Sequence, residues 1–224
     1  MTSDLRLIVF DWDGTLMDSV ARIVACIRAA ITDLELEPRE DTEIRNIIGL
    51  GLREAIEQLY PGCGERLQAD MSAAYRYHFL EANPTPSSLF EGAAATVADL
   101  HAAGYLLAVA TGKGRRGLDK ALRETELEAR FHATRCADET VSKPDPLMLN
   151  QILDELEARP EETLMVGDTE YDMQMARNAG TAALAVSYGV HSPERLGRHA
   201  PAGCIHDIRE LTPWLLDGRN EAAG

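Results

Sequence analysis

The chain has 224 residues, of which 45% are hydrophobic, so it is long enough for one large domain or for a domain with an insertion around a buried core. Its formal net charge of −15 argues against nucleic acid and against an anionic membrane as partners, because both need a basic protein surface. No stretch approaches the roughly 20 apolar residues of a membrane span, and no signal peptide is visible, so the sequence predicts a cytoplasmic protein.

Short apolar runs recur along the chain, and each has the length of a β-strand. In chain order they are residues 5–10, 105–110, 163–166, 182–186 and the weaker 203–205. The runs show little polar alternation, which is typical of strands covered on both faces in a parallel sheet. Between them, residues 91–103 and 148–156 carry apolar side chains at helical spacing. This alternation of strands and helices predicts an α/β doubly wound fold.

Residues 17–82 interrupt this alternation. Three sets of apolar residues recur there at helical spacing, and no strand is expected. The sets fall within residues 23–34, 52–59 and 67–75. A loop with two prolines follows at residues 83–88. We therefore expect a small helical domain, residues 17–83, inserted after the first strand of a core formed by residues 1–16 and 84–224.

The four cysteines show neither a CxxC pair nor the spacing of metal ligands. They are Cys26, Cys63, Cys136 and Cys204. In a chain without a visible secretory signal, this scatter favours buried, reduced thiols over a pair of disulfides.

Polar clusters directly follow three of these apolar runs, and a fourth cluster comes after residues 133–136 and a polar turn. In chain order they are Asp11-Trp12-Asp13-Gly14-Thr15, Thr111-Gly112-Lys113, Lys143-Pro144, and Gly167-Asp168-Thr169 with Asp172 beyond it. In open α/β sheets ligands bind at the carboxyl ends of the strands, so the four clusters can converge on one site. This convergence is stronger evidence than any single motif, because each cluster alone could be a turn or a helix cap.

The residue types in these clusters indicate phosphoryl chemistry that depends on Mg²⁺. Asp11, Asp13 and Asp168 supply hard oxygen ligands, and no His or Cys accompanies them to favour zinc. A Thr hydroxyl, a Gly amide and a Lys ammonium can bind phosphoryl oxygens. Aspartate is also an established nucleophile toward phosphorus. Asp11 and Asp13 are two residues apart, so in extended backbone both side chains leave on the same side.

The four ordered clusters and the helical insertion resemble the haloacid dehalogenase superfamily, and within it the phosphoglycolate-phosphatase-like branch. The resemblance implies a Rossmann-like three-layer core with a helical cap. It implies a phosphoric monoester hydrolase that acts on a small phosphorylated metabolite through an aspartyl phosphate. Asp11 would be the nucleophile, and Asp13 would act as general acid and then as base for the hydrolytic water.

The same resemblance implies the remaining site residues. Mg²⁺ would be bound by Asp11, the backbone carbonyl of Asp13 and Asp168, with Asp172 close by to orient Lys143 or a metal-bound water. The residues implied for substrate binding are Thr111, Gly112, Lys113 and Lys143. Specificity should depend on the helical insertion, with residues 45–53 and 75–78 as the candidate segments.

The same residues also bear on several alternative functions. Asp13 favours phosphorus chemistry over dehalogenation, and residues 17–82 contain no lysine for the Schiff base of a phosphonoacetaldehyde hydrolase. A sugar-phosphate mutase of the β-phosphoglucomutase type stays open, with Arg53 as a cap contact. A catalytically silent binding protein also stays open, although every motif residue is present. The order Asp, Thr, Lys, Asp argues against a phosphate-accepting receiver domain.

Two further points concern the surface of the molecule. Arg115 and Arg116 are expected to be solvated, or to help hold an anionic substrate. The sequence does not indicate whether the chain is a monomer or a homodimer.

Overall fold

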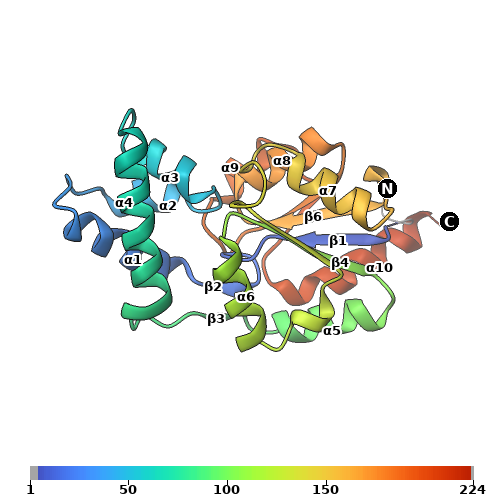
Figure 1. Ribbon diagram of the computed structural model, residues 1–224. Helices are drawn as coiled ribbons and strands as arrows, with labels where there is room; N and C mark the ends of the chain where they lie inside the picture. The colour runs from blue at the N-terminus through green and yellow to red at the C-terminus, as the bar shows by residue number, and fades with distance from the viewer. Residues whose placement is uncertain (1–4, 223–224) are drawn as a thin grey trace.

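The computed structural model describes the backbone of residues 5–222 and the side chains of residues 5–216. Two bodies lie side by side in the molecule (Figure 1): a sheet covered by helices, and a smaller bundle of helices at the left of the view. The bundle is formed by the blue-to-teal part of the chain, which leaves the sheet after its first strand and later returns to it.

The larger body is built on a six-stranded parallel sheet with the order β5-β4-β1-β6-β7-β8. The strands are β1 (Leu7–Phe10), β4 (Leu106–Thr111), β5 (Ala133–Cys136), β6 (Thr163–Gly167), β7 (Ala182–Val186) and β8 (Gly203–Ile205). All four residues of the central strand β1 are buried. Burial on both faces explains why this strand is an uninterrupted apolar run in the sequence.

Helices cover both faces of the sheet and produce three layers (Figure 1). One face carries α5 (Ala93–Ala102), α6 (Arg115–Glu124) and α10 (Leu211–Ala222); the other carries α7 (Leu147–Glu155) and α8 (Glu170–Ala179), with α9 (Pro193–Gly197) beside α8. Alternate residues of β1 face opposite layers: Ile8 packs in the cluster that contains Val97, and Val9 in the cluster that contains Leu149. Short 3-10 turns lie at Glu128–Arg130, Pro160–Glu162 and Ile208–Glu210. The predicted α/β three-layer fold is confirmed.

The smaller body has a hydrophobic cluster of its own, which includes Ile27, Ile44, Ile56 and Met71. Its helices are α1 (Val20–Asp33), α2 (Asp41–Asn46), α3 (Leu52–Leu59) and α4 (Gly64–Tyr77), and α4 continues into a π-helical turn at His78–Ala82. The three predicted sets of apolar residues correspond to α1, α3 and α4. The short α2 was not predicted, because a helix with a single buried residue, Ile44, shows no apolar periodicity.

A small antiparallel ribbon lies where the chain passes between the two bodies. Here β2 (Met17–Asp18) pairs with β3 (Ser88–Leu89). The expectation that residues 17–82 contain no strand, and that Ser88 belongs to a loop, is therefore wrong at these positions. Strands of two residues are too short to produce a period in the sequence, and each depends on a partner far along the chain.

All four cysteines are free thiols. Cys26 and Cys136 are buried as expected, but Cys63 is only partly buried and Cys204 is exposed, so the expectation of burial is wrong for these two. Burial raises the pKa of Cys26 to about 11 and that of Cys136 to about 12. These two thiols therefore stay protonated and unreactive at neutral pH.

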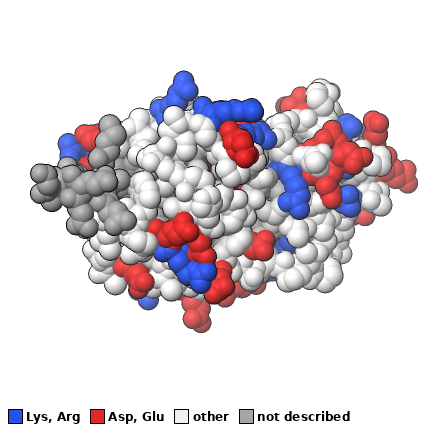
Figure 2. Space-filling view, turned by 180° about the vertical axis from the view of Figure 1, so that it is seen from behind, with Lys and Arg blue, Asp and Glu red and all other residues white. Residues whose placement is uncertain are grey.

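Basic and acidic side chains are interspersed on the face of the molecule seen in Figure 2, and they form no single large basic patch there. Within residues 5–222, none of the helices combines the length and the apolar character needed to cross a bilayer.

Candidate active site

The four predicted clusters meet at the carboxyl edge of the sheet. Asp11 directly follows β1, Thr111 ends β4 and Asp168 follows β6, and these three strands are neighbours in the sheet. Lys143 comes from the connection between β5 and α7. A cavity of about 580 Å³, lined by residues of both bodies, lies at this edge. The structure thus brings together the residues that the sequence places at separate strand ends.

Asp11 is 1% exposed and lines the cavity. Its Oδ1 accepts a hydrogen bond from the Trp12 backbone N–H at 2.6 Å and lies 3.0 Å from Lys143 Nζ. Its Oδ2 is buried and has no hydrogen-bond partner among the described residues. Burial raises the pKa of Asp11 to about 7, although the charge of Lys143 opposes this shift. One oxygen of the carboxylate is therefore fixed, and the other is free to meet a substrate or a cation.

Lys143 is buried between two carboxylates. Its Nζ lies 2.6 Å from Asp172 Oδ1 and 3.0 Å from Asp11 Oδ1. Burial alone would lower the pKa of Lys143, but the two carboxylates outweigh it and raise the pKa above its ordinary value. Asp172 is itself fixed, because its Oδ2 accepts hydrogen bonds from the N–H and the hydroxyl of Thr169 at the start of α8. Lys143 therefore stays charged and is held against Asp11.

Asp168 approaches the same point from the end of β6. Its Oδ1 accepts a hydrogen bond from the Thr15 hydroxyl, and its Oδ2 accepts one from the Val190 backbone N–H, both at 2.8 Å. Gly14 has a φ of +88°, and a Cβ there would overlap the Asp168 carboxylate, so this approach requires glycine. Burial raises the pKa of Asp168 well above its ordinary value, and the charges of Asp11 and Asp172 add to the rise.

Asp11, Asp168 and Asp172 form a buried carboxylate cluster that fits a divalent cation. Each residue offers one oxygen, and these oxygens all lie within 4.8 Å of one another. Like charges buried this close are unfavourable unless a cation or protons offset them, and the free Oδ2 of Asp11 is available as a ligand. An all-oxygen donor set suits Mg²⁺ better than zinc. The Asp13 side chain lies outside this cluster, and the part of its backbone carbonyl stays a prediction.

Asp13 lines the cavity with its carboxylate bound by two side chains. Lys113 Nζ lies 2.9 Å from Oδ1 and 2.8 Å from Oδ2, and the Ser19 hydroxyl donates to Oδ1 at 2.6 Å. Lys113 Nζ also lies 4.3 Å from the ring centroid of Phe79, which belongs to the helical body. No pattern in the sequence indicates Ser19, because a serine before a helix is usually a cap. Here its hydroxyl binds Asp13 instead of the helix.

Thr111 and Gly112 also line the cavity. The Thr111 hydroxyl accepts a hydrogen bond from the Lys113 backbone N–H at 3.2 Å, so it does not cap α6. Gly112 is in close contact with the helical body: a Cβ there would lie 2.5 Å from the carbonyl oxygen of Leu50 and 2.6 Å from that of Gly49. A side chain at position 112 would therefore push the two bodies apart.

One loop of the helical body touches the core beside the site. This docking loop, residues 46–51, runs from the last residue of α2 to the residue before α3. The Gly51 backbone N–H donates to Ser142 Oγ at 2.7 Å, and Gly49 packs against the Thr169 side chain. Ser142 and Thr169 each directly neighbour a residue of the site in the sequence. The position of this loop is thus linked to the segments that carry Lys143 and Asp168.

Asn46 anchors the other end of the docking loop. Its backbone carbonyl accepts a hydrogen bond from the Tyr171 hydroxyl at 2.8 Å, and its side-chain oxygen accepts one from Arg195. Arg195 also pairs with Glu170 at the start of α8. The sequence contains no local signal for these contacts, because each joins residues more than a hundred positions apart or on different elements.

We expect Ser142→Ala to lower kcat/KM by about two- to tenfold, the effect of losing one hydrogen bond of ~0.5–1.5 kcal/mol. The Gly51 amide would lose its acceptor, so its hydrogen exchange should become faster. Exchange measured by NMR together with steady-state kinetics checks both effects. Ser187→Ala serves as a control, because it removes an exposed hydroxyl bonded to His206 away from the cavity. Unchanged exchange at Gly51 and unchanged kcat/KM would contradict the expectation.

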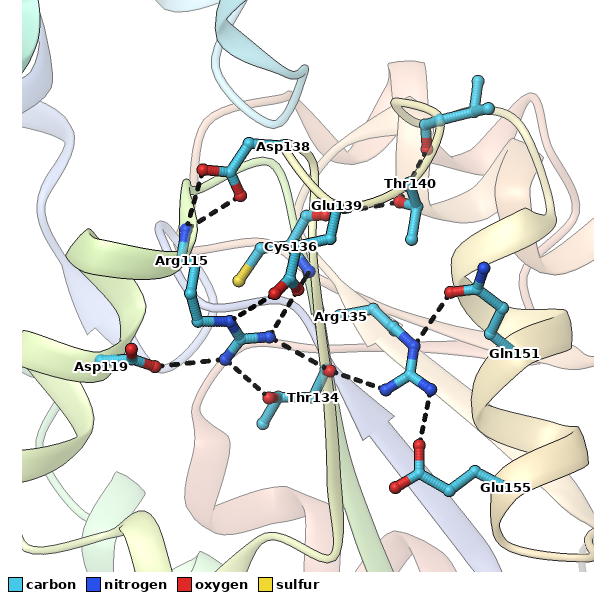
Figure 3. Close-up of polar contacts among 11 residues, drawn as sticks. Arg115, Asp119, Thr134, Arg135, Cys136, Asp138, Glu139, Thr140, Gln151 and Glu155 are labelled. Atoms are coloured by element: carbon cyan, nitrogen blue, oxygen red, sulfur yellow. Dashed lines mark hydrogen bonds and ion pairs between the residues drawn. The ribbon is translucent and has the colours of Figure 1, made fainter.

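Arg115 is held in a network beside the site and is not free for a substrate (Figure 3). Its Nε and Nη2 bind the two carboxylate oxygens of Glu139 at 2.9 and 2.7 Å, and its Nη1 contacts Asp119 and Thr134. Its backbone N–H donates to Asp138. The expectation that this arginine is solvated or contacts an anionic substrate is therefore wrong. The network instead ties the start of α6 to the connection between β5 and α7.

Without a divalent cation, the free energy of unfolding should fall as the pH rises from about 4 to about 7. An unfolded aspartate loses its proton near pH 3.8, whereas Asp11 in the folded protein keeps it until about pH 7, so the unfolded state binds fewer protons in this range. Asp168 contributes with the same sign. Added Mg²⁺ should restore stability near neutral pH, because it binds the deprotonated carboxylates of the folded state.

Urea unfolding across this pH range, with EDTA and then with Mg²⁺, measures the effect. Asp11→Asn should flatten the metal-free slope, because the amide does not titrate. The same slope in this variant, or stability that Mg²⁺ leaves unchanged, would contradict the expectation.

Comparisons with known proteins identify the family to which this chain is similar. The sequence pattern described as haloacid dehalogenase-like hydrolase matches residues 8–186. The "Probable phosphatase IndB" of Dickeya dadantii is 34% identical over 211 residues, which cover 92% of this chain and 91% of that protein. The N-acetylmuramic acid 6-phosphate phosphatase of Pseudomonas putida is 34% identical, covering 85% and 86%. The phosphoglycolate phosphatase of Vibrio cholerae is 28% identical, covering 95% and 97%.

A crystal structure of a haloacid dehalogenase-like hydrolase from Bacteroides fragilis has a similar fold. It superposes with a TM-score of 0.86 at 25% identity and covers 92% of this chain and 99% of that one. The match to the family pattern includes the segments that carry Asp11, Thr111, Lys143 and Asp168. The chain belongs to the haloacid dehalogenase-like hydrolase family.

Proposed function

We propose that the protein is a Mg²⁺-dependent phosphatase that hydrolyses a small phosphomonoester through an aspartyl phosphate on Asp11. The observation that carries this proposal is the buried Asp11 carboxylate. It lines the cavity, has one free oxygen and lies 3.0 Å from the charged Lys143 ammonium group. A nucleophilic carboxylate beside a fixed cation suits phosphoryl transfer, because the transferring group is anionic.

The reaction would take two steps. In the first, a carboxylate oxygen of Asp11 attacks phosphorus and the ester P–O bond breaks, while Asp13, in its protonated form, gives its proton to the departing alcohol oxygen. In the second, Asp13 takes a proton from a water molecule, whose oxygen attacks the phosphorus of the aspartyl phosphate. Inorganic phosphate leaves and the Asp11 carboxylate is regenerated.

The other predicted residues would bind and position the phosphoryl group. Thr111, Gly112 and Lys113 line the cavity and offer donors to the phosphoryl oxygens, and Lys143 offsets their negative charge. Asp172 keeps Lys143 in place through their 2.6 Å contact.

Asp11 and Asp168, together with the Asp13 backbone carbonyl, would hold Mg²⁺, with Asp172 beside them. When bound, the cation supplies further charge stabilisation to the phosphoryl oxygens.

Residues 17–83 would act as a cap over a core of residues 1–16 and 84–224. Two observations support this division: the helical body has its own hydrophobic cluster, and the cavity is lined from both sides. Closure of the docking loop on the core would exclude bulk water from the reacting groups.

Replacing Asp13 tests the acid role. We expect Asp13→Ala to lower kcat strongly for alkyl phosphates and much less for nitrophenyl phosphate, whose leaving group needs no proton. Steady-state kinetics with both substrates measures the loss of kcat for each. We expect kcat to fall by about a hundredfold for the alkyl ester. Equal losses for the good and the poor leaving group would contradict the role.

Phosphate release from a panel of small phosphomonoesters tests the function itself. The panel contains phosphoglycolate, sugar phosphates, nucleotides, pyrophosphate and nitrophenyl phosphate, each with Mg²⁺ and then with EDTA. We expect release that requires the metal, with a phosphoglycolate-like ester as the first candidate. If the folded protein releases no phosphate, a sugar-phosphate isomer assay decides between a mutase of the β-phosphoglucomutase type and a silent binding protein. Arg53 on the cavity wall is the observation that keeps the mutase as the alternative.

A further inference from the structure

Three arginines at the cavity have no partner in the described part of the protein. Arg53 on α3, Arg76 on α4 and Arg116 on α6 line the cavity, and all three are exposed. None of them forms an ion pair or a side-chain hydrogen bond with another described residue. Arg115 and Arg195, by contrast, are paired with carboxylates.

The overall charge makes this arrangement informative. The chain has 37 acidic and 22 basic residues, so carboxylates are abundant as partners for an arginine. Among the residues that the structure describes, the cavity lining beyond Asp11 and Asp13 has two further acidic side chains beside the three arginines. These are Glu54 and Asp138, and Asp138 already accepts the backbone N–H of Arg115. Apart from Asp11, Asp13 and Lys113, the cavity lining therefore carries three guanidinium groups against two carboxylates, an excess of positive charge that favours an anion there.

Part of the cavity wall is apolar. Ile23, Ile47 and Leu52 line it, and so do the rings of Tyr75 and Phe79, which lie 5.6 Å apart between centroids. A volume of about 580 Å³ falls within the range of about 300–1,000 Å³ that is typical of pockets for drug-sized ligands. A leaving group of two carbons, such as glycolate, would leave most of this space and this apolar surface unused.

From these three features we infer that the substrate's leaving group carries a second oxyanion, a carboxylate or a phosphate, on an apolar or ring-shaped body, and that Arg53, Arg76 and Arg116 bind this oxyanion. The inference rests on the proposed phosphatase activity and replaces its first candidate, a phosphoglycolate-like ester, with an ester of a larger leaving group. Guanidinium groups suit this task, because their planar donors match the two oxygens of a carboxylate or phosphate. The body of the leaving group would lie on the apolar wall, with the scissile phosphoryl group at Asp11.

Matched pairs of substrates test the inference. The carboxylate pair is 4-carboxyphenyl phosphate and 4-carbamoylphenyl phosphate, which have the same shape and differ in the distal charge. The phosphate pair is glucose 1,6-bisphosphate and glucose 6-phosphate. We expect the charged member of at least one pair to have a kcat/KM about tenfold higher or more. The pair that shows the difference identifies which oxyanion is bound.

Variants of the arginines then assign the effect. Arg53→Gln, Arg76→Gln and Arg116→Gln should each reduce the charged-to-neutral ratio of kcat/KM, and the triple variant should bring it close to one. Arg130→Gln is the matched control, because Arg130 is exposed and lies outside the cavity lining. Circular dichroism establishes that each variant is folded.

The outcomes separate the inference from the proposed function. Phosphate release from both members of each pair at equal rates, unaffected by the arginine variants, would overturn the inference and leave the phosphatase function in place. A ratio that falls equally in Arg130→Gln would also overturn it. No release from any compound would contradict the proposed function, and the inference with it.

Discussion

Asp11→Asn should abolish turnover while the protein stays folded. The amide has nearly the same shape as the carboxylate but is a poor nucleophile, so we expect kcat to fall by about 10⁴-fold or more, ~5.5 kcal/mol of transition-state stabilisation. The fold should tolerate the change, because an amide oxygen can still accept the 2.6 Å hydrogen bond from the Trp12 N–H. Lys143 would also keep its 2.6 Å contact with Asp172.

Phosphate release and urea unfolding, measured on the same preparation, check both halves of this prediction. Asp18→Asn is a suitable control, because it makes the same chemical change at an exposed position in β2. Turnover of Asp11→Asn within about tenfold of the unmodified protein, a change of only ~1.4 kcal/mol, would remove Asp11 from the role of nucleophile.

Among the substitutions proposed for this protein, Lys143→Met should lower the free energy of unfolding the most. The side chain is buried and lies between two buried carboxylates, Asp11 and Asp172. Without the Lys143 ammonium group the negative charges of these carboxylates are left uncompensated. Breaking a buried ion pair in this way lowers the free energy of unfolding by about 3–5 kcal/mol. Activity should be lost as well, because no other described lysine lies within ion-pair distance of Asp11.

The pH dependence of this loss distinguishes electrostatics from packing. The loss should be larger near pH 8 than near pH 5, since burial lets Asp11 and Asp168 take up protons more readily than ordinary aspartates. Urea unfolding without metal at both pH values measures it. Lys120→Met is the control, because this partly exposed side chain makes only a surface pairing with Glu124 and one hydrogen bond to the Leu80 carbonyl, worth about 1 kcal/mol each. An equal, small loss for both variants would contradict the account of Lys143.

The fold and the clusters of candidate site residues could be predicted because they depend on local pattern. A buried parallel strand must be a short apolar run, and the carboxyl ends of neighbouring strands meet at one edge of the sheet. Asp11, Thr111 and Asp168 each follow such a run, so their convergence could be predicted from the sequence. The helical body was predictable for the same reason, since three of its helices are amphipathic.

The remaining parts depend on contacts across the fold. Ser19 binds Asp13, and Ser142 binds the docking loop through Gly51, but neither serine stands in a pattern that sets it apart from a cap or a turn residue. From the sequence, Arg115 is expected to be solvated or to contact an anionic substrate. The structure shows instead that its guanidinium group forms an ion pair with Glu139. The two-residue strands β2 and β3 likewise have no period of their own.

The most direct test of the central claim is to trap the phosphorylated Asp11. The protein is mixed with a good phosphomonoester substrate and Mg²⁺, quenched, and treated with borohydride, which reduces an acyl phosphate to the alcohol. Peptide mass spectrometry should then find homoserine in place of Asp11 in the peptide that spans β1, and only when substrate is present. Metal-dependent phosphate release without any such modification at Asp11, or with the modification at another aspartate, would contradict the account.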